Sequence, residues 1–421
     1  MKLKPAYFIL PLTCLNLAMG PCQDESIGNL RVDGGGDASA TTDNDGGTPA
    51  IGGRGGSDPN GSGGRGGTGS GGTPATGGNG GATVPSVPEI IALTDNPVDL
   101  AVDGSFVYWT GYGDHVRAAT TGMALGHVSK VAKAGGPVIQ LAGSQVNPFH
   151  IAVDEASVYW TVSGSKPPSA TFPGYAAGAV RKVSLAGGAP QEIFSSAALP
   201  AAISLHGGYV YWLLGSSVDR WDGVVRDMSE FKPEDWGLWR ARIDGTNVQR
   251  MNDLVGHLSH HIAISGGIGY YGFAGPVDSN RGGVYAVDLN TPRSVGDPRP
   301  ILYEGALGIM PADVAVGGSS LFVSALNDGK ILSIPLAGGT PTPITTFPFS
   351  DNHTLTTDGQ NVYFIAGPGQ DVLMKAPFGG GSATVVAYLK GVGKYLAVDA
   401  THVYVTGGDV INKGTISRVP K

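Results

Sequence analysis

A strand pattern recurs through this chain at a spacing that few architectures can hold. The run LAVD at 100–103, followed by VYWT at 107–110, returns as IAVD at 151–154 followed by VYWT at 158–161, and weaker copies continue to the C-terminus. Each copy joins a short apolar run, a tight turn and an aromatic run, which is typical of β-strands. Such a unit cannot bury its apolar faces alone, so neighbouring units must stack.

The aligned copies predict a β-propeller. Their inner strands begin at Asp99, His150, Ala202, His261, Asp313, Thr354 and Tyr395. Four strands in a unit of about 40–60 residues are typical of a propeller blade. We therefore predict an all-β, seven-bladed propeller, with a six-bladed ring as the alternative if one copy is degenerate. The last copy supplies three strands, so we expect residues 89–93 to add the fourth and close the ring.

The best-preserved copies resemble the YWTD repeat of LDL-receptor class B-type propellers and of related bacterial extracytoplasmic propeller lipoproteins. The resemblance rests on Pro148, IAVD at 151–154, VYWT at 158–161 and VRKVSLAGG at 180–188. The positions of the family's aspartate hold Gly111, Val162 and Leu214 in this chain. The resemblance therefore implies the propeller fold, and no receptor function follows from it.

The N-terminal residues predict export. Residues 1–22 combine Lys2 and Lys4 with an apolar stretch at 6–18 that is too short to span a membrane, as in a signal peptide. Cys22 is the candidate lipidation site of a bacterial lipoprotein, and cleavage near residues 18–20 to give a secreted protein is the alternative. Both outcomes place the protein outside the cytoplasm, with membrane contact only through a lipid anchor.

Residues 23–86 separate this signal from a propeller domain at 87–421. The stretch at 33–82 is rich in Gly, Ser and Thr and has one large aliphatic residue, Ile51. It cannot bury enough apolar surface to offset its chain entropy, so we predict a disordered linker. Both cysteines, Cys14 and Cys22, precede the propeller, which therefore has no disulfide.

Charge excludes one class of partner. The formal net charge is −7 and 14% of residues are charged, with no cluster of Lys or Arg. This balance argues against nucleic acid binding. We expect a monomer whose partner is a protein or a glycan of the cell envelope.

One candidate binding site is the long loop of the third copy. Tryptophan and arginine are frequent anchors of protein interfaces, and tryptophan also stacks on sugars. The loop's candidate ligand-binding residues are Trp221, Trp236, Arg220, Asp222 and Arg226. The alternative is that Trp221 and Trp236 fold back onto the blade as packing residues.

A second candidate site lies at the central channel. Asp99, His150, His261 and Asp313 occupy equivalent positions where inner strands begin, with His260 beside them. In a closed ring these positions converge on the axis, where carboxylates and imidazoles could hold a divalent cation. The alternative is that they line a water-filled channel. No cofactor is otherwise indicated.

These features favour a non-enzymatic binding module that presents a loop-rich face to its partner. The alternative function is a metal-dependent propeller hydrolase or lyase with its site at the channel mouth. We name no catalytic residue, because none of the glutamates of the repeat region lies at the start of an inner strand.

Overall fold

The computed structural model describes a set of ranges between residues 84 and 421. These ranges are 84–112, 125–162, 178–196, 199–215, 237–252, 257–258, 260–274, 281–294, 297, 301–306, 311–325, 329–346, 354–366, 372–389, 395–408 and 413–421. All belong to one compact unit, and residues 1–83 lie outside the described ranges. Within these ranges no helix is long and apolar enough to cross a membrane.

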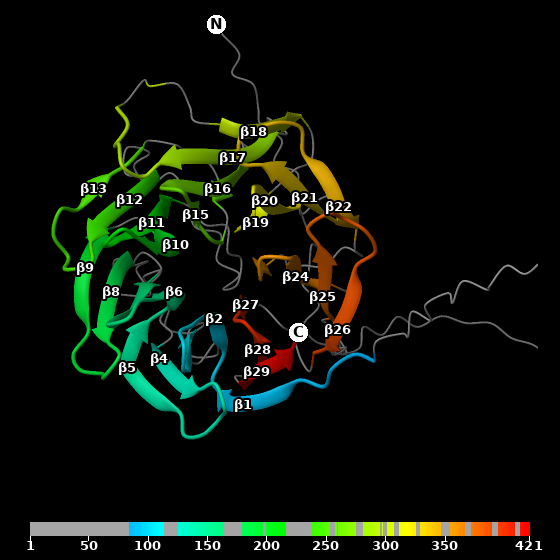
Figure 1. Ribbon diagram of the computed structural model, residues 1–421. Helices are drawn as coiled ribbons and strands as arrows, with labels where there is room; N and C mark the ends of the chain where they lie inside the picture. The colour runs from blue at the N-terminus through cyan, green and yellow to red at the C-terminus, as the bar shows by residue number, and fades with distance from the viewer. Residues whose placement is uncertain are drawn as a thin grey trace, which may run out of the picture. The chain divides into compact units, whose positions relative to one another are not determined.

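The described strands form seven antiparallel sheets, which are the blades of one propeller around a central axis (Figure 1). Blades 1 to 3 comprise β2 (Pro97–Val102), β3 (Phe106–Gly111), β4 (Leu125–Ala132) and β5 (Ile139–Val146); β6 (Pro148–Val153), β7 (Ser157–Val162), β8 (Gly178–Ser184) and β9 (Gln191–Ser196); and β10 (Leu199–His206), β11 (Tyr209–Gly215), β12 (Gly237–Arg242) and β13 (Gln249–Arg250). The prediction of an all-β, seven-bladed propeller is confirmed, and the six-bladed alternative is excluded.

The other four blades follow the same order from the axis outwards. Blade 4 comprises β14 (His257–Leu258), β15 (Ala263–Ser265), β16 (Ile268–Ala274), β17 (Arg281–Asp288) and β18 (Ile301–Ala306). Blades 5 and 6 comprise β19 (Pro311–Gly317), β20 (Ser320–Ala325), β21 (Lys330–Pro335) and β22 (Thr342–Thr346), and then β23 (Leu355–Thr357), β24 (Asn361–Ala366), β25 (Val372–Pro377) and β26 (Thr384–Tyr388). Blade 7 comprises β27 (Leu396–Val398), β28 (His402–Gly408), β29 (Gly414–Pro420) and β1 (Glu89–Thr94).

The N-terminal strand closes the ring, as the sequence predicts. Strand β1 pairs with the C-terminal strand β29, so that Glu89 lies opposite Arg418. The Arg418 guanidinium also forms an ion pair with the Glu89 carboxylate at 2.8 Å. Just before β1, the Ser86 N–H donates to the Val386 carbonyl in blade 6. The two ends of the propeller chain are thereby tied into one sheet.

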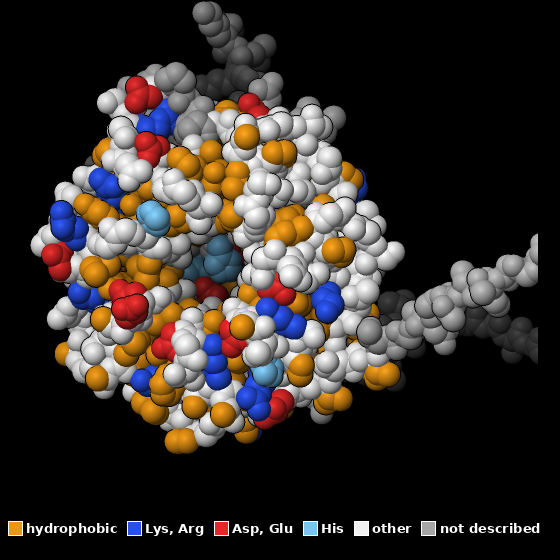
Figure 2. Space-filling model, in the orientation of Figure 1, with side chains coloured by type: hydrophobic (Ala, Val, Ile, Leu, Met, Phe, Trp, Pro, Cys, Tyr) orange, Lys and Arg blue, Asp and Glu red, His pale blue; other side chains and the backbone are white. Residues whose placement is uncertain are grey.

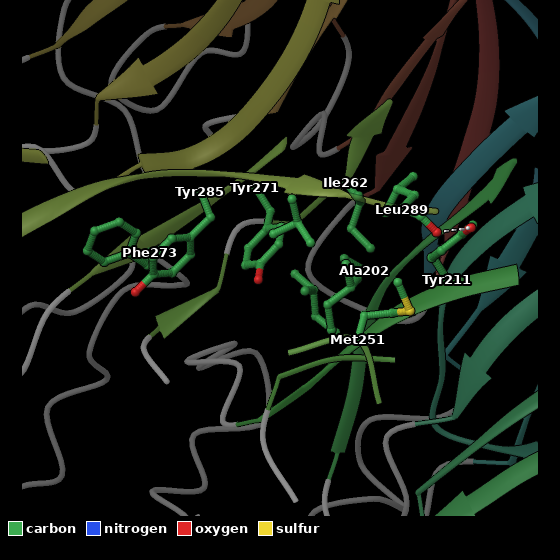
Figure 3. Packing of buried hydrophobic residues seen from close by; sticks show 11 residues of the cluster. Ala202, Tyr211, Met251, Ile262, Tyr271, Phe273, Tyr285 and Leu289 are labelled. Atoms are coloured by element: carbon green, nitrogen blue, oxygen red, sulfur yellow. Dashed lines mark hydrogen bonds between the residues drawn. The ribbon is translucent and has the colours of Figure 1, made fainter. Parts of the chain in front are cut away.

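The aromatic residues of the second strands fill the space between blades. Trp109, Trp160 and Trp212 are fully buried, and so are the tyrosines that precede them. Figure 3 shows this packing where blade 3 meets blade 4: Tyr211 and Met251 lie against Ile262 and Leu289. Each aromatic side chain can bury about 150–250 Å², which explains why the repeat conserves bulky residues at this position along the chain.

Blade 4 departs from the repeat at its inner strand. Strands β14 and β15 both pair with β16, but the ladder is interrupted between Leu258 and Ala263. The described residues between these pairs are His260, His261 and Ile262, which stand against Tyr271 and Gly272 in an enlarged β-bulge. The bulge carries His260 and His261, and the His260 N–H donates to the Ala312 carbonyl of blade 5.

Candidate functional site

Hydroxyl side chains at the ends of second strands place the first residues of the inner strands. The Thr110 hydroxyl accepts the Asp99 N–H at 3.3 Å and donates to the Phe149 carbonyl of the next blade. The same hydroxyl position accepts the inner-strand N–H in three other blades, through the pairs Thr161–His150, Ser324–Asp313 and Thr406–Tyr395. The last residue of the VYWT motif thus fixes the position of the inner-strand residue whose side chain points to the axis.

Two aspartates join neighbouring blades at the axis. One Asp99 carboxylate oxygen accepts the Leu100 N–H at 2.7 Å, and the other accepts the Ile151 N–H of blade 2 at 3.1 Å. Asp313 repeats the arrangement, because it accepts the Val314 N–H at 2.8 Å and the Leu355 N–H of blade 6 at 3.0 Å. Both carboxylates are therefore held rigidly by backbone donors.

One histidine of the ring, His261, connects these two aspartates, and the other, His150, contacts Asp99. His261 Nδ1 lies 2.9 Å from both carboxylate oxygens of Asp313, and its Nε2 lies 3.7 Å from Asp99 Oδ1. His150 Nδ1 lies 3.2 Å from the other Asp99 oxygen. The structure thus brings together all four axial residues that the sequence singles out, from blades 1, 2, 4 and 5.

The charges in this cluster differ between the two imidazoles. Burial opposes ionisation of Asp99, but the hydrogen bond from His150 and the ion-pair contact with His261 outweigh it and hold the pKa of Asp99 well below its usual value. Burial also opposes the cationic form of His261, yet the hydrogen bond to Asp313 and the charges of Asp313 and Asp99 raise its pKa well above the ordinary value. Burial lowers the pKa of His150. At neutral pH Asp99 is therefore a carboxylate, His261 an imidazolium and His150 a neutral imidazole.

His261 lines a central cavity, whereas the other three members of the cluster are buried beside it. The side chains of Asp99, His150 and Asp313 are at most 1% exposed, whereas that of His261 is 26% exposed. A cavity of about 360 Å³ extends from His261 along apolar inner-strand residues, among them Leu100, Ile151, Val314 and Leu396. Figure 2 shows this hollow at the centre of the propeller, with a histidine surface inside it.

Apolar and aromatic side chains enclose the cluster. Val98, Tyr112, Phe149 and Tyr395 form one buried group. The Phe149 ring meets the His150 ring edge-on, with centroids 4.3 Å apart. The Tyr395 ring lies against His150, His260 and His261 at centroid distances of 5.7 to 6.0 Å. Three of the four ring side chains are therefore enclosed by protein, while His261 remains partly exposed.

Sequence reasoning missed the contribution of Tyr395 to this site and named His260 only as a neighbour of the ring residues. Tyr395 shares the aligned position of the ring residues and packs on three histidine rings, although its type does not suggest a polar site. The bulge of blade 4 brings His260 beside His261, and the Tyr395 hydroxyl lies 3.4 Å from His260 Nδ1. The sequence pattern and the spacing of the repeats do not reveal that a strand contains extra residues. The only sequence sign of this bulge is the pair of consecutive histidines.

The third blade contributes no polar group to the ring. Ala202 stands at the aligned position, and its backbone adopts a φ of +36°, which is rare for a residue with a side chain. Its methyl group packs with Tyr211 and Ile262 in the core between blades 3 and 4. The loop candidates Trp221, Trp236, Arg220, Asp222 and Arg226, and the lipidation candidate Cys22, lie outside the described residues.

Comparison with known proteins supports the fold and leaves the activity open. No protein-family model matches the sequence, and no curated protein matches it either. Among solved structures, YCF48 bound to a D1 peptide has a TM-score of 0.51 at 12% identity, covering 80% of this chain and 97% of that one. Puromycin hydrolase has a TM-score of 0.50 at 13% identity, covering 78% of this chain and 53% of that one. A chain from a nidogen–laminin complex has a TM-score of 0.40 at 17% identity, covering 58% and 77%.

Proposed function

We propose that this protein is a non-enzymatic binding propeller of the cell envelope, which presents the loop-rich face of blades 1 to 3 to a protein partner. The proposal rests on one asymmetry of the described strands. The connections between second and third strands span residues 112–124, 163–177 and 216–236 in blades 1, 2 and 3. The equivalent connections span only residues 326–329, 367–371 and 409–413 in blades 5, 6 and 7.

Three adjacent blades therefore carry the long connections on one side of the propeller. Turns between first and second strands, on the opposite side, are short in all seven blades. Loop length concentrated on one rim of a rigid scaffold is typical of a recognition surface. The Trp and Arg residues of the 216–236 connection are of the types that anchor protein interfaces.

The burial and hydrogen bonding of the axial carboxylates favour a binding protein over a hydrolase. Asp99 and Asp313 each accept two backbone N–H groups, and His261 is shared between them. A general base needs a group that can reach a substrate, and these carboxylates are fully buried. YCF48, whose fold is similar, is a propeller solved with a peptide bound, which makes a protein partner a reasonable choice over a glycan.

The test replaces the proposed anchors in the full-length protein. We expect Trp221→Ala combined with Trp236→Ala to leave the melting temperature unchanged and to lower capture of envelope proteins by at least about tenfold, because hot-spot residues contribute 2 kcal/mol or more each. Capture is measured by cross-linking in cells, affinity isolation and mass spectrometry against the wild type.

Tyr388→Ala is the matched control, because Tyr388 is an exposed aromatic residue on the outer strand of blade 6. This variant should capture the same partners as the wild type. Equal capture by the double variant and the wild type would contradict the proposal. Retention on glycan arrays, lost in the double variant, would show that the partner is a carbohydrate instead.

A further inference from the structure

We infer that Asp99, His150 and His261 form a binding site for a divalent transition metal ion of the Zn²⁺ type, with one coordination position open to the axial cavity. The three side chains come from blades 1, 2 and 4, and one ligand atom of each lies within 4.8 Å of the other two. Two imidazole nitrogens and one carboxylate suit zinc and its neighbours better than calcium or magnesium, which prefer oxygen ligands.

The distance between His261 and Asp99 is the first argument. His261 Nε2 and Asp99 Oδ1 are 3.7 Å apart, which is longer than an ordinary N–H···O hydrogen bond of about 2.7–3.2 Å. Zinc–nitrogen and zinc–oxygen bonds measure about 2.0–2.2 Å in an approximately tetrahedral site, so two ligands of one ion lie roughly 3.5 Å apart. The observed gap is therefore close to the separation that a shared ion requires.

The second argument is the outer partner of His261. Its Nδ1 donates to the Asp313 carboxylate at 2.9 Å, and this bond directs Nε2 towards Asp99. A carboxylate on the far nitrogen is the usual way in which a metal-binding histidine is oriented and made more basic. When the ion binds, it takes the place of the proton on Nε2. Asp313 is thus a positioning residue for the site, and the bulge of blade 4 brings His261 to it.

The third argument is that only one of the three candidate ligands faces the cavity. Asp99 and His150 are almost completely buried, whereas His261 faces the cavity. An ion held by all three would have protein on most sides and the cavity on one. Three protein ligands with a fourth position left open are typical of zinc sites that bind an exchangeable ligand. The cavity beside that position is also lined by Leu100 and Val314.

The experiment uses the full-length protein, treated with EDTA and dialysed, and ZnCl₂ as the probe. We expect one zinc ion per chain by calorimetry and elemental analysis, together with an upward shift of the melting temperature. His150→Gln should lower the affinity at least about tenfold, and Asp313→Asn should lower it about 10- to 100-fold. His206→Gln is the matched control, because His206 is an exposed histidine at the end of β10 and lies outside the ligand set, and it should bind zinc as the wild type does.

Cobalt substitution tests the open position. Co²⁺ bound at this site should give visible absorption bands that change when azide is added. An unchanged spectrum would overturn the open position and indicate a closed site. The absence of stoichiometric zinc binding by the wild type, or equal affinity in the wild type and His150→Gln, would overturn the site itself. The loop variant of Trp221 and Trp236 should bind zinc normally, so this result is independent of the proposed partner.

Discussion

Single side chains at fixed positions of the repeat join blades that backbone ladders cannot join. At the axis these are the hydroxyls of Thr110 and Thr406, each of which contacts two blades at once. At the opposite ends of the inner strands, aspartates in the turns instead join the strands within one blade. Asp358 accepts the N–H groups of Gln360 and Asn361 and the hydroxyl of Tyr363. The turns of blades 1, 2 and 7 repeat this arrangement through Asp103, Asp154 and Asp399.

The turn aspartates should make stability depend on pH. Burial opposes ionisation of Asp358, but its backbone hydrogen bonds, Tyr363 and Lys421 lower its pKa from 3.8 to about 2. A lowered folded-state pKa means that the unfolded chain binds the proton more readily, so the stabilisation is present above pH 3.8 and disappears as pH falls towards 2. We expect Asp358→Asn to lower the free energy of unfolding by up to about 2 kcal/mol at pH 7.

Denaturant unfolding of the wild type and Asp358→Asn between pH 2 and pH 7 measures this effect. The two proteins should converge in stability at the acid end. Glu155→Gln removes an exposed carboxylate from the turn of blade 2 and should track the wild type throughout. A constant difference between wild type and Asp358→Asn across the range would show that the carboxylate's charge is not responsible.

Among the strands, the interrupted inner strand of blade 4 positions the axial cluster. Regular strands alternate their side chains between two faces, and an insertion of extra residues breaks this alternation. The bulge between β14 and β15 thereby lets His261 reach Asp99 and Asp313 on two other blades. Gly272 of β16 lies opposite this bulge. A Cβ added to Gly272 would lie 2.5 Å from the Pro311 side chain of blade 5.

This close approach predicts a specific cost of adding one methyl group. We expect Gly272→Ala to lower the free energy of unfolding by about 1–3 kcal/mol, because blades 4 and 5 must separate to admit the methyl group. Gly104→Ala is the control, since no atom lies within 4 Å of an added Cβ there and its φ needs no glycine. Urea unfolding measures both. Equal stability of the two variants would mean that the interface between these blades adjusts freely.

At the scale of the whole molecule, ring closure depends on a strand from the other end of the chain. Ile91 and Ala92 of β1 are buried in the core that contains Trp109 and Tyr404. The Lys133 ammonium of blade 1 also contacts the Asp399 carboxylate of blade 7 at 2.7 Å. Blades 7 and 1 are therefore joined by apolar packing and by an ion pair at the point where the chain's ends meet.

Deletion of residues 84–94 should open this closure. We expect a loss of at least about 3 kcal/mol in the free energy of unfolding, from the burial of Ile91 and Ala92 alone, together with an exposed edge at β29 that promotes aggregation. Thermal melts and light scattering measure the two effects. Deletion of residues 33–82 is the control and should leave the melting temperature unchanged, as expected for a linker. If the variant without residues 84–94 melted at the same temperature as the full-length protein, β1 would be dispensable for stability.

The repeat alone determined the architecture, because strand periodicity and turn residues are local properties that recur in each blade. The same spacing predicted the seven blades, the closing strand at 89–93 and the convergence of Asp99, His150, His261 and Asp313. The tertiary structure decided how these four side chains pair. Their contacts cross between blades and depend on a bulge and on hydroxyl hydrogen bonds, and a one-dimensional pattern does not encode such distances. It also decided that three of the four are buried while His261 lines a cavity, because burial depends on what every other blade places around the axis.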